Sequence, residues 1–132
     1  MKKGYKALID EANAEIEAIS PAEAATLLAD EGTVIVDIRD PRELERDGRI
    51  PGAFHATRGM LEFWIDPESP YHKPVFASGK TFVFYCAGGL RSALATKTAQ
   101  DMGLTPVKHI EGGFGAWKEA GLPVEKVERK GG

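Results

Sequence analysis

The segment FVFYCAGGLRSALA, residues 82–95, holds the residues best suited to chemistry, because it contains the chain's only cysteine, Cys86. Apolar and aromatic residues precede Cys86, two glycines follow it, and Arg91 lies five positions further on. We expect the apolar stretch to form a strand, the glycines to let the backbone curl, and a helix to begin near Leu90. Backbone N–H groups, the positive end of that helix and the Arg91 guanidinium would then surround the sulfur. Such surroundings favour the thiolate, the nucleophilic form of cysteine.

A simpler interpretation of the same segment gives it only a structural role. A lone cysteine after an apolar run is often a small buried core residue. The glycines would then be an ordinary tight turn, and Arg91 a surface charge in a first helical turn. The coincidence of strand end, glycines, arginine and helix start at one point favours the nucleophile.

Alternating strands and helices are predicted along most of the chain. An amphipathic helix is predicted within 5–19, with a strand near 15–19. Ser20 with Glu23, and Asp40 with Glu43, are capping-box pairs that predict helix starts, each with proline at the first helical position. Further strands are predicted at 33–38, 53–56, 80–86 and within 106–113, further helices at 90–103 and 114–121, a short helical segment at 58–66 and a loop at 66–79. Apolar strands alternating with helices predict an α/β fold with a parallel sheet and right-handed crossovers.

Length and composition restrict the class of protein. The 132 residues suit one domain, which we divide into an N-terminal helical extension (1–14), a folded domain (15–126) and a flexible tail (127–132). A net charge of −3 gives no basic field for nucleic acid. One cysteine allows no internal disulfide, and the sequence shows neither a signal peptide nor a membrane span, so we expect a cytoplasmic protein without membrane contact. His55, His72 and His109 have no metal-ligand spacing, and we expect no metal and no cofactor.

The chain resembles the rhodanese family, and specifically its single-domain sulfurtransferases. Four stretches carry the resemblance: VIVDIRDPRELERDGRIPGAFHA (34–56), YCAGGLRSALA (85–95), HIEGGFGAW (109–117) and AGLPVE (120–125). Their order and spacing are more specific than any one of them. One departure is Arg49, where the family often has histidine, and we expect it to alter local packing only. The resemblance implies a single rhodanese-like domain with a central parallel sheet of about five strands and helices on both faces.

The resemblance also implies a mechanism, in which Cys86 attacks the outer sulfur of a donor such as thiosulfate or a persulfide and becomes a persulfide itself. It then passes the sulfur to cyanide or to a thiol, with a sulfur-accepting protein as a further candidate partner. Backbone N–H groups would stabilise the anionic sulfur, so no catalytic histidine is required and His109 is predicted to have no chemical role. The predicted substrate-binding residues are Ala87, Gly88, Gly89, Leu90, Arg91 and Arg58, and the predicted supports of the loop are Ser92, Asp37 and Arg39. For Arg58, a solvated loop arginine is an equal alternative.

Two other functions are compatible with parts of the pattern. Cysteine phosphatases and arsenate reductases need five residues between cysteine and arginine, whereas four separate Cys86 from Arg91. They also need an acid for the leaving oxygen, for which Asp37 or Asp66 would be the candidates. The second alternative is a rhodanese-like domain that only binds a partner or relays sulfur.

Overall fold

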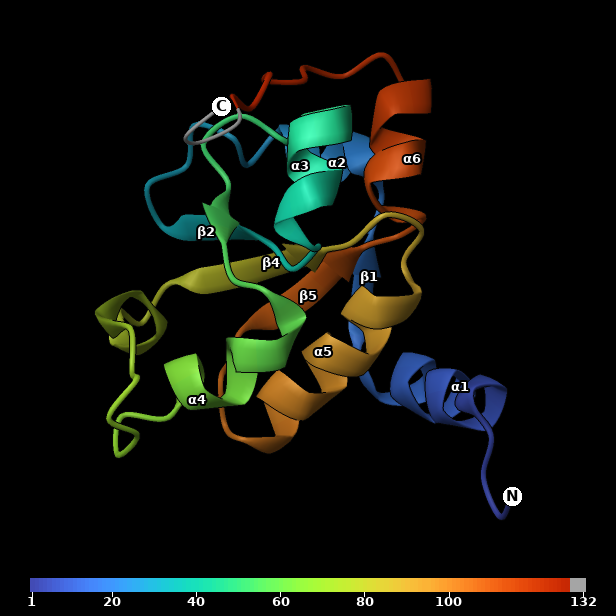
Figure 1. Ribbon diagram of the computed structural model, residues 1–132, viewed down its shortest axis with the longest axis vertical. Helices are drawn as coiled ribbons and strands as arrows, with labels where there is room; N and C mark the ends of the chain where they lie inside the picture. Colours follow the sequence, from blue (N-terminus) through green and yellow to red (C-terminus); the bar gives the residue numbers. More distant parts are fainter. Residues whose placement is uncertain (129–132) are drawn as a thin grey trace.

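Parallel strands form one sheet at the centre of the computed structural model, which describes residues 1–128 (Figure 1). The strands are β1 (Glu17–Ile19), β2 (Thr33–Asp37), β3 (Phe54–His55), β4 (Thr81–Tyr85) and β5 (Val107–Ile110). They lie in the order β1-β5-β4-β2-β3, and every neighbouring pair is parallel. The predicted α/β fold with about five parallel strands is therefore confirmed.

Helices cover both faces of this sheet. The α-helices are α1 (Tyr5–Glu15), α2 (Pro21–Ala25), α3 (Pro41–Asp47), α4 (Leu61–Ile65), α5 (Leu90–Asp101) and α6 (Gly113–Glu119), and two 3-10 turns are η1 (Arg58–Met60) and η2 (Pro74–Ala77). In Figure 1, α2, α3 and α6 lie above the sheet, and α4 and α5 lie below it, with α1 beside α5. Within residues 1–128, no helix is both long enough and apolar enough to cross a bilayer.

Local sequence signals account for where two of these helices begin. Ser20 and Asp40 precede α2 and α3 as N-caps, and each forms a complete capping box with the glutamate three residues later. These side chains satisfy backbone N–H groups that have no partner inside the helix. The two predicted helix starts are confirmed.

Side chains of β4 alternate between two hydrophobic clusters. Phe82 and Phe84 pack toward α5 and η2, whereas Val83 and Tyr85 pack toward α2 and α6. Cys86 follows β4 directly and belongs to the cluster of Phe82 and Phe84. The two-residue period of a strand therefore directs Cys86 to the same face as α5.

The segment 66–79 differs from its prediction as a loop, because it contains η2. Phe76 within this turn is buried, and its ring centroid lies 5.4 Å from that of Phe82 and 5.9 Å from that of Phe54. The prolines suggested a structureless segment, but Pro74 occupies the first position of the 3-10 turn. Burial of Phe76, a tertiary effect, orders the turn.

The two ends of the chain were predicted to be a helical extension and a flexible tail. The helical extension predicted for 1–14 corresponds to α1, whose Ile9 and Ala12 pack against Ala93 of α5. The predicted tail, 127–132, lies partly outside the described residues. The boundaries themselves stay predictions.

The backbone of the Cys86 segment is held by the first turn of α6. The N–H of Phe114 donates to the carbonyl of Cys86 at 2.8 Å, and the N–H of Gly115 donates to that of Ala87 at 3.0 Å. Gly113 has φ of +62°, and a Cβ there would lie 2.5 Å from the Cys86 carbonyl oxygen. Only glycine fits this position without displacing the backbone after β4.

Replacing Gly113 with alanine should therefore destabilise the protein more than replacing Gly121, which has φ of +71° and nothing within 4 Å of a Cβ. Gly121→Ala should cost about 1 kcal/mol of unfolding free energy for its backbone conformation alone, and Gly113→Ala about 2–3 kcal/mol. Urea denaturation of both variants measures the difference. Equal losses would contradict the close approach between Gly113 and Cys86.

Candidate active site

The Cys86 sulfur lies buried at the carboxyl end of β4 and is surrounded by hydrogen-bond donors. The backbone N–H of Gly89 donates to Sγ at 3.1 Å, and that of Ser92 at 3.3 Å. The Ser92 hydroxyl lies 3.5 Å from the same sulfur. A sulfur that receives two backbone N–H donors is placed where negative charge is stabilised.

The curl of residues 86–91 depends on one left-handed residue. Gly89 has φ of +99° and is the N-cap of α5, so the chain turns directly from β4 into the helix. The first N–H groups of α5 and the positive end of its dipole then lie beside the sulfur. The structure thus brings together Cys86, the loop from Ala87 to Leu90 and the start of α5, as the sequence predicted.

Ser92 connects Cys86 to His109, for which the sequence predicted no chemical role. Its hydroxyl lies 2.9 Å from Nδ1 of His109 in β5, and both side chains are buried. Ser92 was predicted to support the loop, which stays a prediction, and its hydroxyl lies between the sulfur and the imidazole. Burial lowers the pKa of His109, and the nearby charge of Glu111 opposes that shift.

Strand register was the signal that could have identified His109. Phe84 of β4 pairs with His109 of β5, and Phe84 shares its face of the sheet with Cys86. Paired residues on adjacent strands point to the same side, so His109 faces α5, where Ser92 lies in the first turn.

Arg91 forms a bidentate ion pair with Glu43, which links the start of α5 to α3. Nη1 and Nη2 of Arg91 each lie 2.9 Å from a carboxylate oxygen of Glu43. The hydrogen bonds from Arg91 lower the pKa of Glu43 to about 2. A depressed carboxyl pKa means that the pair stabilises the fold above the ordinary value of 4.5, and that this contribution is lost as the pH falls toward 2.

Asp37 and Arg39 form a fully buried ion pair at the end of β2. Nη2 of Arg39 donates to Asp37 at 2.7 Å and to the carbonyl of Gly48 at 2.7 Å. The hydroxyl of Tyr85 donates to Asp37 at 2.6 Å, and burial raises the pKa of Tyr85. The pair therefore fixes the residue that immediately precedes Cys86. Its guanidinium also lies 4.3 Å from the ring centroid of Phe114 in α6.

Arg58 is not brought to the loop in the same way. Its Nη1 donates to Glu62 of α4 at 2.8 Å, and within residues 1–128 no hydrogen bond or ion pair joins its side chain to residues 86–92. Its role in donor recognition stays a prediction.

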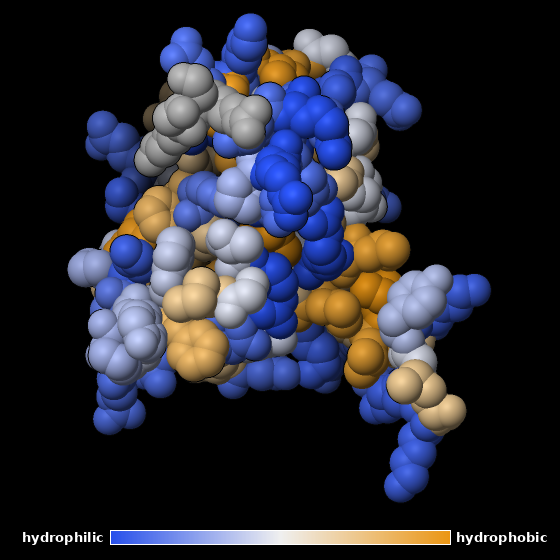
Figure 2. Space-filling model, in the orientation of Figure 1, coloured by the Kyte–Doolittle hydropathy of each residue, from blue (hydrophilic) through white to orange (hydrophobic). Residues whose placement is uncertain are grey.

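A hollow of about 340 Å³ opens beside the loop. Gly88, Gly89 and Leu90 line one side, and His109 and Glu111 lie at the end of β5. The other lining residues are Asn13 of α1, Ile16 between α1 and β1, and Ala18 of β1. Figure 2 shows apolar side chains gathered where α1 meets the start of α5. The exposed Leu90 of α5 lies there beside Tyr5 and Ile9 of α1. A small ligand that enters this hollow would contact the backbone of Gly88 and Gly89, which follow Cys86 in the loop.

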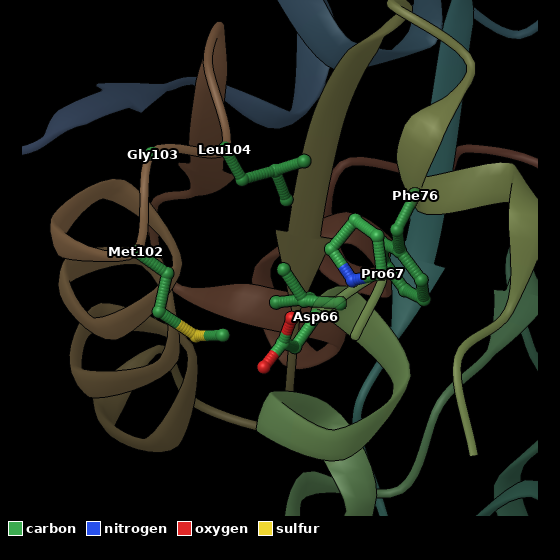
Figure 3. A pocket seen from close by; sticks show the side chains of 7 residues that line it. Asp66, Pro67, Phe76, Met102, Gly103 and Leu104 are labelled. Carbon is green, nitrogen blue, oxygen red and sulfur yellow. The ribbon is translucent and has the colours of Figure 1, made fainter. Parts of the chain in front are cut away.

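A larger hollow, about 440 Å³, lies at the other end of α5 (Figure 3). Met102, Phe76 and Leu104 line it with Asp66 and Pro67. Since α5 has 12 residues, its two ends are about 18 Å apart, so this hollow is separate from Cys86. Within residues 1–128, no group of three His, Cys, Asp or Glu side chains is arranged to hold a metal ion.

Comparisons with known proteins agree with this geometry. The family model for the rhodanese-like domain matches residues 20–120. The thiosulfate sulfurtransferase GlpE of Actinobacillus pleuropneumoniae serotype 5b is 32% identical over 107 residues, which are 81% of this chain and 91% of GlpE. An uncharacterized protein of Synechocystis is 33% identical over 83% of this chain, and the chain spans only 56% of that relative's length.

Solved structures give the same fold. A Rhodopseudomonas palustris protein of unknown function, described as a possible tyrosine phosphatase, has a TM-score of 0.92 and 67% identity over 95% of this chain and 96% of its own. The homodimeric polysulfide-sulfur transferase of Wolinella succinogenes has a TM-score of 0.69 and 31% identity over 96% of this chain and 89% of its own. With a family model that covers most of the chain and a GlpE relative that is 32% identical over 81% of it, this protein belongs to the rhodanese family.

Proposed function

We propose that the protein is a sulfurtransferase that moves a sulfane sulfur from a small anionic donor, such as thiosulfate or a persulfide, to cyanide or a thiol. The observation that carries this proposal is the buried Cys86 sulfur, which faces the N–H groups of Gly89 and Ser92. The names of the GlpE and polysulfide-sulfur transferase relatives support the same reaction class.

The transfer has two steps, both centred on Cys86. In the first step, the Cys86 sulfur attacks the outer sulfur of thiosulfate, a new S–S bond forms, and sulfite leaves with the electrons of the broken S–S bond. In the second step, a thiolate or cyanide attacks the terminal sulfur, and Cys86 leaves as a thiolate. Neither step needs an external oxidant or reductant, so the reaction requires no redox cofactor.

The persulfide intermediate carries its negative charge on the terminal sulfur, which needs donors within the curl of residues 86–91. Backbone N–H groups from Ala87 to Arg91 are held in place by Gly89 and by the first turn of α6. Preorganised donors lower the energy of a charge that develops during reaction. Ile16, Ala18 and Leu90 in the lining of the adjoining hollow would also offer apolar contact to a protein that presents an acceptor thiol.

A phosphatase is the second candidate function, because the similar Rhodopseudomonas structure is described as a possible tyrosine phosphatase. Three features favour sulfur transfer instead. Only four residues separate Cys86 from Arg91, and Glu43 occupies both terminal nitrogens of that arginine. The two candidate acids are also misplaced: Asp37 is buried in its pair with Arg39, and Asp66 lines the hollow at the far end of α5.

Incubating the protein with thiosulfate should add about 32 Da, one sulfur atom, to its intact mass, and Cys86→Ser should abolish this gain. The loaded protein should then form thiocyanate from cyanide, whereas the variant should not. Uptake without transfer to cyanide or any thiol would identify a binding or storage module. Hydrolysis of an aryl phosphate without sulfur uptake would identify a phosphatase.

Arg91→Ala should raise KM for thiosulfate by roughly tenfold, because it removes a positive charge beside the loop whose attraction for the anionic donor is taken as about 1.4 kcal/mol. Glu43→Gln is the matched control, since it breaks the same ion pair but keeps the positive charge. If the charge of Arg91 recognises the donor, Glu43→Gln should leave KM near or below the wild-type value. Equal increases in both variants would show that the pair only holds the loop in place.

A further inference from the structure

We propose that Ser92 and His109 form a proton relay for Cys86, in which His109 takes the thiol proton as Cys86 attacks and returns it when Cys86 leaves. The proposal rests on the proposed function, in which the sulfur of Cys86 is the nucleophile. It assigns His109 as a positioning residue that acts through Ser92.

The three groups form an unbroken chain of short contacts. Ser92 Oγ lies 3.5 Å from Cys86 Sγ and 2.9 Å from His109 Nδ1. All three side chains are at least 96% buried. A hydroxyl has one proton to donate, so it cannot donate to both neighbours at once.

That single proton couples the state of Cys86 to the state of His109. When Cys86 is a thiol, it donates to Ser92, and Ser92 donates to an unprotonated Nδ1. When Cys86 is a thiolate, Ser92 donates to the sulfur, and Nδ1 must carry a hydrogen and donate to Ser92. Ionisation of Cys86 therefore moves one proton along the chain to His109, and protonation reverses the movement.

The surroundings of His109 suit a proton acceptor. Burial favours the neutral imidazole by lowering its pKa, and in the tautomer with its hydrogen on Nε2 the Nδ1 atom accepts from Ser92. Glu111 favours the charged form once the proton arrives. Its strand partners are the uncharged Phe84 of β4 and Ala18 of β1, Ser92 of α5 contacts its Nδ1, and Asn13 of α1 lines the same hollow. The histidine also borders the hollow beside the loop, which gives it a route for proton exchange with solvent.

The relay balances both steps of sulfur transfer. In the first, Cys86–SH and thiosulfate give the Cys86 persulfide anion and sulfite, while the proton goes to His109. In the second, a thiolate takes the terminal sulfur, and the leaving Cys86 sulfur recovers the proton through Ser92. No oxidant or reductant enters either step.

Alkylation of Cys86 by iodoacetamide across pH tests the relay without depending on turnover. At about pH 6, His109→Gln and Ser92→Ala should each react roughly tenfold more slowly than wild type, because the thiolate loses its partner. At about pH 9, where solvent hydroxide ionises the thiol, the rates should converge. His72→Gln is the control, since its ring Nδ1 contacts the carbonyl of Trp64 and not Cys86.

The double variant Ser92→Ala/His109→Gln should react no more slowly than the slower single variant, because both changes break one chain. Equal slowing at every pH, additive slowing, or no slowing, in variants with wild-type unfolding curves, would overturn the relay. Sulfur loading measured by mass in parallel separates the two proposals. If wild type takes up no sulfur while alkylation keeps its dependence on His109, the proposed function fails and the relay stands.

Discussion

The hydrogen bonds from Gly89 and Ser92 to the Cys86 sulfur impose the constraint on which the rest of the site depends. They require the backbone to reverse within a few residues after β4 and then to enter α5 without a break. Gly89 makes the reversal with its positive φ, and Gly113 lets α6 approach closely enough to bind the carbonyls of Cys86 and Ala87. The carbonyls of Cys86 and Ala87 thus accept hydrogen bonds from α6, while the N–H groups of Gly89 and Ser92 point toward the sulfur.

A second constraint acts on the residue before Cys86. Tyr85 is tied to Asp37, which is tied to Arg39, and Arg39 extends the network to the end of α3 through Gly48. Burying an ion pair gains little net stability, whereas leaving one of its charges alone in the core costs several kcal/mol, about 3–5. The network thus acts against any arrangement in which the end of β4 shifts relative to β2. Such a shift would also move the sulfur.

Local chemistry made part of this predictable from the sequence. The capping boxes at Ser20 and Asp40, the apolar run before Cys86 and the glycines after it each act within a few residues of their own position. The contacts of Arg91 and Ser92, in contrast, join residues that are far apart in the sequence. Arg91 meets a glutamate 48 positions away, and Ser92 meets a histidine 17 positions away. Glu43 was predicted only as a capping residue, yet the same carboxylate also binds Arg91, because α3 follows β2 and lies beside the end of β4.

The N-terminal helix shows how a segment outside the matched family region takes part in the site. The family match begins at residue 20, but α1 packs on α5 through Ile9, Ala12 and Ala93, and Ala93 follows Ser92 directly. The helix thus packs against the first turn of α5, which contains the N–H and hydroxyl groups of Ser92. Asn13 and Ile16 extend the same contact to the hollow beside the loop. Because the hollow is bounded by α1 on one side and by Gly88 and Gly89 on the other, its width depends on how tightly α1 holds the first turn of α5. One packing contact, between α1 and the first turn of α5, thus joins the wall of the hollow to the turn that contains Ser92.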